Sequence, residues 1–269
     1  MKMYYPFIGT VIVTLFLGFG CKNEKNQTQI DMADSTDMAI TDKNTIYRLP
    51  SPVDMYMLMF DNQNQFDKTL INNPVRISDY YTKFSKMVNF GIYASDLSYC
   101  TVFNQNQESF QYFKTAKTLA DELGYTEGFN EVLIKRIEQS QYHLDTLYQV
   151  SMDAYWDACT FLEDQGKTDE LTIILAGGWI ESLYIAFSSV KKFDPADIVV
   201  SRLAEQDLLL DNLLSMFKSF ERDEQAQKLY ARLSDLKDAY AQIGGGTFTV
   251  DQFEALKQKI TMFRNELTK

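Results

Sequence analysis

The chain has 269 residues and a formal net charge of −11 at pH 7, from 37 acidic and 26 basic side chains, with one histidine. This negative charge disfavours binding to nucleic acid and to anionic lipid headgroups. One histidine and three cysteines also leave few ligands for a zinc site or a facial triad.

The first 20 residues have the pattern of a secretory signal peptide. Lys2 supplies a positive start, and the mostly apolar stretch from Tyr4 to Gly20 carries no charge. An uncleaved membrane anchor is the alternative, but a membrane span needs about 20 apolar residues and this run is shorter. We therefore predict that residues 1–20 are removed as a signal peptide.

The residues before Cys21 indicate a lipoprotein cleavage site. Gly20 supplies a small residue directly before the cysteine, although Phe19 departs from the usual small-residue pattern. We predict that the Cys21 sulfur is lipidated, with palmitate among the acyl chains, and that this lipid is the contact with the membrane. Each buried CH₂ contributes about 0.8 kcal/mol, so several chains anchor stably. Asn23 favours the outer membrane over retention at the inner membrane, and both periplasmic and surface-facing orientations stay open.

A polar segment separates this site from the folded part. Residues 21–45 are rich in Asn, Gln, Asp and Thr and predict a disordered tether. No shift in composition divides residues 46–269, so we predict one domain there. Loss of Lys2 with the signal peptide gives the mature chain a net charge of −12.

Apolar residues at helical spacing, with signals for helix ends, divide this domain into helices. Ser78 is expected to cap a long helix, Gly124 to end the next, Asp194–Pro195 to begin another, and Thr249 with Gln252 to form a capping box. The expected helices cover residues 52–60, 78–99, 106–123, 130–165 with a possible break near 140, 169–187, 195–220, 223–243 and 249–263.

These helices predict an all-α fold. No segment shows sustained alternation with turn pairs, which makes a sheet unexpected. Connections of two to eight residues favour antiparallel neighbours. We predict a multi-helix bundle or an array of antiparallel helical hairpins behind the signal peptide and tether.

Two cysteines remain once Cys21 is acylated. Cys100 and Cys159 could form one disulfide in an oxidising compartment. Each lies in a helical pattern beside aromatic residues, which favours buried free thiols.

A search for catalytic motifs gives mostly negative results. His143 has no partners at metal-ligand spacing, and the chain has no Gly-x-Ser-x-Gly sequence. Residues 244–246 are three glycines without the lysine that a phosphate loop requires. No cofactor and no metal site are predicted.

Two acidic residues stand out within apolar helices. Asp96 is an isolated acid in residues 89–99, and Glu181 is the only charge in residues 171–187. Gly177 and Gly178 precede Glu181 although a mid-helix glycine costs about 1 kcal/mol against alanine. Such a cost indicates close helix packing or room for a ligand.

A buried carboxylate must find a donor, shift its pKa or line a cavity. In the structural interpretation, both acids hold helices in register by binding tyrosines, serines, Arg76, Arg136 or Arg202. In the functional interpretation, they lie in an aromatic-lined pocket for a small polar or cationic ligand. The candidate ligand-binding residues are Tyr93, Asp96, Tyr99, Trp179, Glu181 and Tyr184.

Several segments resemble one group of proteins. These segments are Leu49-Pro-Ser-Pro52, Gly91-Ile-Tyr-Ala-Ser-Asp-Leu-Ser-Tyr99, Leu119-Ala-Asp-Glu-Leu-Gly124 and Gly177-Gly-Trp-Ile-Glu-Ser-Leu-Tyr184. Together they resemble a family of helical lipoproteins from Bacteroidota. The resemblance covers about residues 49–187 and implies the envelope compartment and the helical fold, without an activity or site residues.

Two classes of function follow. The first is a membrane-anchored envelope lipoprotein with a non-enzymatic binding or accessory role toward a protein partner or a small polar ligand. The alternative is a hydrolase-type enzyme using Asp96 and Glu181 in an aromatic-lined pocket, which requires both carboxylates to face one accessible cavity.

Overall fold

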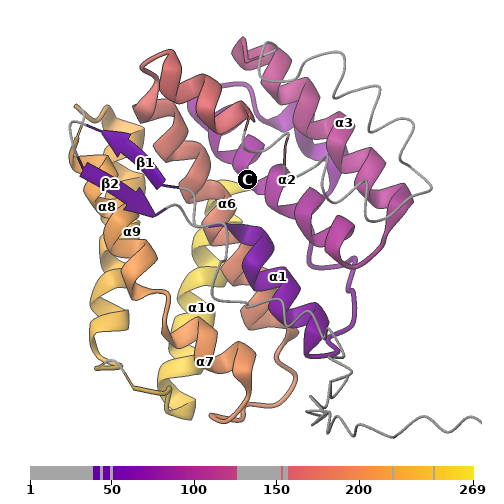
Figure 1. Cartoon of the computed structure of the whole chain (residues 1–269), viewed down its shortest axis with the longest axis vertical. Helices are drawn as coiled ribbons and strands as arrows, with labels where there is room; N and C mark the ends of the chain where they lie inside the picture. The colour runs from indigo at the N-terminus through magenta and orange to yellow at the C-terminus, as the bar shows by residue number, and fades with distance from the viewer. Residues whose placement is uncertain are drawn as a thin grey trace, which may run out of the picture. The chain divides into compact units, whose positions relative to one another are not determined.

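Helices make up most of the described backbone (Figure 1). The computed structural model describes residues 39–42, 45–48, 51–125, 153, 157–219, 221–244 and 246–269. Within these ranges the predicted all-α fold is confirmed. The expected signal peptide, the lipidation site at Cys21 and His143 lie outside them.

The first helix, α1, spans Pro52–Asp61. Its first residue is a proline, which fits there because the first helical N–H has no partner within the helix. This helix is the one expected from residues 52–60, with one more residue at its end. Val53, Tyr56 and Met59 point into the core and are buried.

The second helix, α2, begins later than the sequence suggested. A short 3₁₀ helix, η1, covers Pro74–Asp79 and contains Ser78, the expected cap. The actual cap is Thr82, whose side chain accepts from the Ser85 backbone in a capping box, so α2 runs from Lys83 to Val102. The prediction of Ser78 was wrong because the proline at the start of η1 begins a separate tight turn first.

The third helix, α3, spans Asn106–Leu123 and ends at Gly124, as predicted. Gly124 has a φ of 78°, the left-handed conformation that glycine adopts without a Cβ clash. The next predicted helix, residues 130–165, lies mostly outside the described residues. Its last part is described, and residues 157–164 are helical.

Helix α6 spans Thr168–Ser189 and is buried along most of its length. It is long and apolar enough to cross a membrane by length and composition alone, but 89% of its most apolar stretch is buried inside the protein. Its apolar surface is therefore covered by neighbouring helices, as in the core of a globular domain.

The helix expected over residues 195–220 is two helices. Asp194 accepts from the Ala196 backbone in a turn, and Asp197 caps α7, which spans Ile198–Ala204. Helix α8 then spans Asp207–Lys218. The prediction of one continuous helix was wrong because the intervening Gln206 turns inward to bind another helix.

The last two helices follow their capping signals. Asp223 caps α9, which spans Glu224–Ala241, and Thr249 forms the expected capping box with Gln252 at the start of α10, which spans Val250–Leu267. Both predicted beginnings are confirmed.

A two-stranded antiparallel ribbon was not expected. Strand β1 spans Ala39–Asp42 and pairs with β2, which spans Thr45–Arg48. Only two residues separate the strands, so the pairing is short and local. The ribbon begins inside the range predicted as a tether, and the expectation of no strands was wrong there because β-branched and aromatic residues in this segment favour extended backbone.

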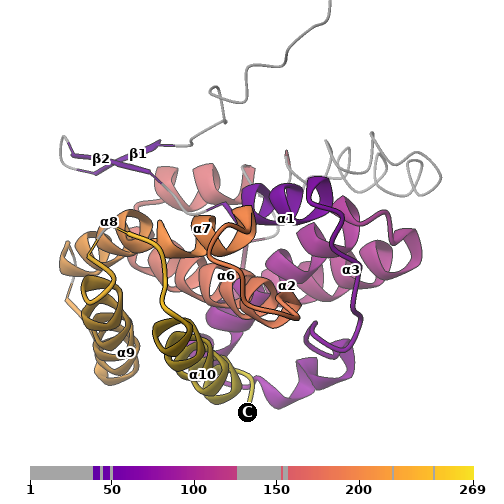
Figure 2. The ribbon, with the colours of Figure 1, turned by 90° about the horizontal axis from the view of Figure 1, so that it is seen from below.

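Helix α6 lies at the centre of the helical packing. It contacts α1, α2, α7, α8 and α10, and its most extensive contact is with α2. Figures 1 and 2 show α3 and α9 on opposite sides of it. Cys100 on α2 and Cys159 are both buried, and neither is in a disulfide.

Candidate functional site

Three glycines bring α2 and α6 into backbone contact. A Cβ on Gly91 would lie 1.9 Å from the Ile174 carbonyl oxygen, and one on Gly178 would lie 3.2 Å from the Gly91 carbonyl oxygen. A Cβ on Gly177 would lie 2.2 Å from the Val88 oxygen. The glycines therefore allow close helix packing, and they do not make room for a ligand between the two helices.

This contact places Glu181 in the core, where it is fully buried and paired with Arg264 from α10. The Arg264 Nε and Nη2 atoms each donate to a different Glu181 oxygen, both at 2.8 Å. The C-terminal end of α10 is also bound to α2, because Asn89 Nδ2 on α2 donates to the Leu267 carbonyl oxygen at 2.9 Å. Burial opposes the charge of Arg264, but Glu181 outweighs it and raises the arginine pKa.

Asp96 on α2 is also fully buried and lies within hydrogen-bonding reach of Glu181. Its Oδ2 atom accepts from the Asn72 backbone N–H at 3.0 Å. Its Oδ1 atom accepts no hydrogen bond from the residues that the structure describes. Burial raises the pKa of Asp96 well above its usual value, and the charge of Glu181 adds to the rise.

Asn72 connects this acid pair to the surrounding tyrosines. Its side-chain Nδ2 donates to the Tyr80 hydroxyl at 2.9 Å, and its backbone carbonyl oxygen accepts from the Tyr112 hydroxyl at 2.7 Å. The loop before η1 is thereby joined to α2 and α3. This arrangement is a buried hydrogen-bonded network, which is strong only when its members are satisfied.

The four aromatic residues expected to line a pocket are mostly packed into the core. The Tyr93 hydroxyl donates to the Asn73 carbonyl oxygen at 2.9 Å, and the Tyr99 hydroxyl accepts from the Asp67 backbone at 3.0 Å. Burial raises the pKa of Tyr99 to about 12. These two side chains are fully buried, so they meet protein groups and have no solvent-facing surface.

The other two aromatic residues lie on α6. Trp179 is 1% exposed and donates through Nε1 to Gln206 Oε1 at 3.2 Å. Tyr184 is half-buried, and the Arg264 guanidinium lies 4.7 Å from its ring centroid. The structure thus joins Asp96, Glu181 and Tyr184 around Arg264, while Trp179 binds elsewhere.

This geometry favours the structural interpretation of the two acids, although with other partners than expected. Arg76 pairs with Asp79 and Arg202 with Glu205. Arg136 lies outside the described residues. The partner that the sequence analysis missed is Arg264.

A signal for Arg264 is present in the sequence. It lies four residues after Ile260 and directly after Phe263, on the apolar stripe of the last helix. A charge on that stripe is as unusual as Glu181 in its own helix. The two exceptions could have been matched by their opposite charge, whereas the backbone donor of Asn72 has no such signal.

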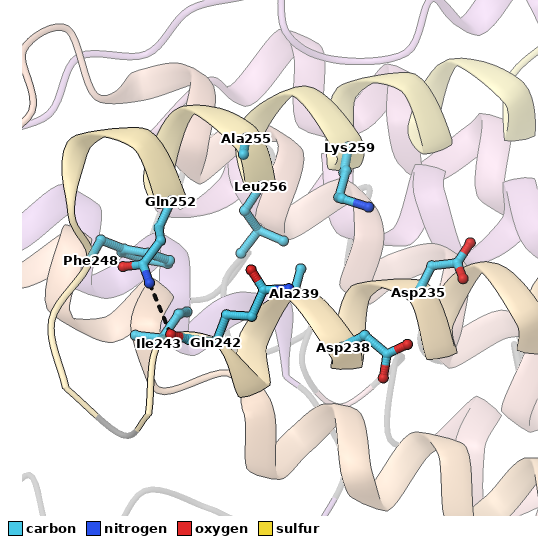
Figure 3. Close-up of a pocket in the computed structure, with 10 residues that line it drawn as sticks. All are labelled: Asp235, Asp238, Ala239, Gln242, Ile243, Phe248, Gln252, Ala255, Leu256 and Lys259. Carbon is cyan, nitrogen blue, oxygen red and sulfur yellow. Dashed lines mark hydrogen bonds between the residues drawn. The ribbon is translucent and has the colours of Figure 1, made fainter.

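A second feature is a surface groove between α9 and α10 (Figure 3). Its volume is about 120 Å³. Asp235, Asp238 and Lys259 lie toward one end, and the buried Phe248 lies toward the other. Small-molecule pockets usually measure about 300–1,000 Å³, so this groove has room for a side chain or a few waters rather than for a whole organic ligand.

No group of three or more His, Cys, Asp or Glu side chains suited to a metal ion occurs among the described residues. The chain matches no protein-family model, no curated protein and no solved structure. Inference about function therefore depends on the residues themselves.

Proposed function

We propose that this protein is a membrane-anchored envelope lipoprotein with a non-enzymatic binding or accessory role, and that it acts through its surface on a protein partner. The observation that supports this proposal is the use of the buried polar residues. Asp96, Glu181 and the candidate aromatic residues bind protein groups or pack in the core. A polar core used in this way stabilises a body that presents its surface to a partner.

The hydrolase alternative receives no support from this geometry. A catalytic carboxylate pair must reach substrate and water, yet Asp96 and Glu181 are both 0% exposed. Both oxygens of Glu181 are also occupied by Arg264. Substrate access would require α2, α6 and α10 to separate.

The small groove favours a protein partner over a small ligand. A volume of about 120 Å³ accepts a single inserted side chain. At one end of the groove the two acids Asp235 and Asp238 outnumber the one base, Lys259, so we expect the inserted side chain to be basic.

Site-specific photo-crosslinking in the bacterial envelope tests the partner. A crosslinking residue at Gln242, which lines the groove and is exposed, should capture one protein reproducibly, whereas one at the exposed Gln111 on α3 should not. Charge reversal of Asp238 to lysine should remove the Gln242 product. Equal products at both positions, or none at Gln242, would contradict a role for this groove.

Metabolic labelling with a palmitate analogue tests the anchor. The wild-type chain should take up the label and sediment with the outer membrane, and Cys21→Ser should lose both properties. Membrane association of Cys21→Ser would instead favour an uncleaved N-terminal anchor.

A further inference from the structure

The closest helix contact in the core forces two acids together. Because Gly91 and Gly178 let the α2 and α6 backbones touch, the carboxyls that follow them on each helix lie within hydrogen-bonding reach. Neither side chain has any exposed surface. Two ionised carboxylates at this separation would repel each other strongly in a medium of low dielectric constant.

One arginine cannot neutralise both acids. The Arg264 Nε and Nη2 atoms are both directed to Glu181, and Asp96 receives only the neutral Asn72 N–H. Asp96 Oδ1 is left without a donor among the described residues. Because both Glu181 oxygens already accept from Arg264, a proton shared between the two acids would have to be carried by Asp96.

The other titratable groups around Asp96 do not supply positive charge. Those that interact with it are hydroxyls and a thiol, drawn from α1, α3, α6 and α2 itself: Tyr56, Tyr112, Tyr184, Tyr93 and Cys100. Among the groups that act most strongly on Asp96, Arg264 is the base. With both acids ionised, this buried cluster would lack one positive charge.

We propose that Asp96 is a neutral carboxyl in the folded protein at neutral pH and donates its proton to Glu181. In this arrangement the charge of Arg264 balances that of Glu181, and the three side chains together carry no net charge. The proton also gives the Asp96 carboxyl the hydrogen bond that its Oδ1 atom otherwise lacks. Folding at neutral pH takes up one proton from water to complete this unit. The consequence is a fold whose stability responds to pH.

The direction of the response follows from proton linkage. An unfolded aspartate releases its proton above a pH of about 3.9, while the folded state keeps it. Stability is therefore fully present below that pH and is lost as pH rises toward the higher folded pKa. In that interval the folding equilibrium constant should fall about tenfold per pH unit from this residue.

Asp96→Asn tests the proposal, because an amide donates like a protonated carboxyl but does not titrate. We would measure unfolding by urea from acidic to neutral pH, on the full chain in non-ionic detergent. The ratio of the variant's folding equilibrium constant to that of wild type should rise about tenfold per pH unit. Asp238→Asn, at an exposed acid of α9, should give a nearly constant ratio. A constant ratio for Asp96→Asn would overturn the proposal.

Infrared spectroscopy gives a second measurement that does not require the variant to fold. Wild-type protein at neutral pH should show the carbonyl stretch of a protonated carboxyl, and this band should disappear when the protein is unfolded. Where Asp96→Asn folds, its spectrum should lack the band. Absence of the band from native wild-type protein would show that Asp96 is ionised and would refute the proposal.

Discussion

Arg264 binds both carboxylate oxygens of Glu181 at 2.8 Å although the two residues are 83 positions apart in the sequence. The contact joins α10 to α6 deep in the core, and the side chain of Arg264 is only 10% exposed. Buried pairs of this kind are costly to break from one side, since the remaining charge loses its partner without regaining water.

Arg264→Leu should therefore destabilise the protein by about 3–5 kcal/mol in urea unfolding at neutral pH. Lys117→Met provides a control, because it breaks an exposed pair with Asp121 one turn away on α3. That change should cost less than about 1 kcal/mol. Similar losses from the two variants would show that the Glu181 pair is not desolvated in solution.

Gly91→Ala should also be strongly destabilising, because the added methyl would lie 1.9 Å from the Ile174 backbone oxygen. Overpacking typically costs about 1–3 kcal/mol, and here the obstacle is backbone rather than a movable side chain. Gly246→Ala is the matched control, since its Cβ would meet only the Ile243 oxygen at 3.6 Å. Thermal unfolding should separate the two variants clearly, and equal melting temperatures would contradict close contact of α2 and α6.

The lowered pKa of Glu170 predicts that this residue stabilises the fold more as pH rises, the opposite of the effect proposed for Asp96. Burial opposes its ionisation, but hydrogen bonds from Lys83 and Tyr125 outweigh burial and lower the pKa of Glu170. Its stabilising effect is present above the unfolded pKa of about 4.3 and is lost as pH falls through the folded value. The loss of folding stability at acidic pH should therefore depend in part on the contact of Glu170 with Lys83 and Tyr125.

Tyr125→Phe, which removes the hydroxyl bound to Glu170, should cost about 1.5–3 kcal/mol at neutral pH and less when the carboxylate is protonated. Urea unfolding at neutral pH and at a pH below the lowered folded pKa of Glu170 measures the difference. Tyr81→Phe, at a tyrosine that is 85% exposed, should have little effect at either pH. A cost that does not change with pH would argue against a charged Glu170.

Cys100 and Cys159 should resist alkylation in the native protein. Both thiols are buried, and burial raises the pKa of Cys100, so little thiolate is accessible. In a Cys21→Ser background, mass spectrometry should find both cysteines unmodified by iodoacetamide before unfolding and both modified afterwards. Protection that persists in denaturant and ends only after reduction would reveal a disulfide instead.

Local signals were sufficient for several helices. Gly124 ends α3, Asp223 begins α9, and Thr249 with Gln252 begins α10, each by bonding to backbone within four residues. A feature that depends on so short a stretch of chain can be recognised in that stretch. The all-helical class follows from the same local patterns.

The errors concern residues whose roles depend on distant partners. The break between α7 and α8 accompanies a hydrogen bond that Trp179, 27 residues away, donates to the Gln206 side chain. Both acids of the candidate site stood out as charges within apolar helices, but their partners, Arg264 and the Asn72 backbone, come from other parts of the chain. Spacing within one helix cannot specify such pairs.

The sequence separation of Glu181 and Arg264 also affects when the core can form during synthesis of the chain. A ribosome produces α2 and α6 well before α10, so a growing chain contains Asp96 and Glu181 before their arginine exists. Burying Glu181 at that stage would leave a charge unpaired, at a cost of several kcal/mol. The α2–α6 contact is therefore expected to remain open until the last helix arrives. Such a delay would suit a chain that is threaded unfolded through a membrane, as the proposed export route requires.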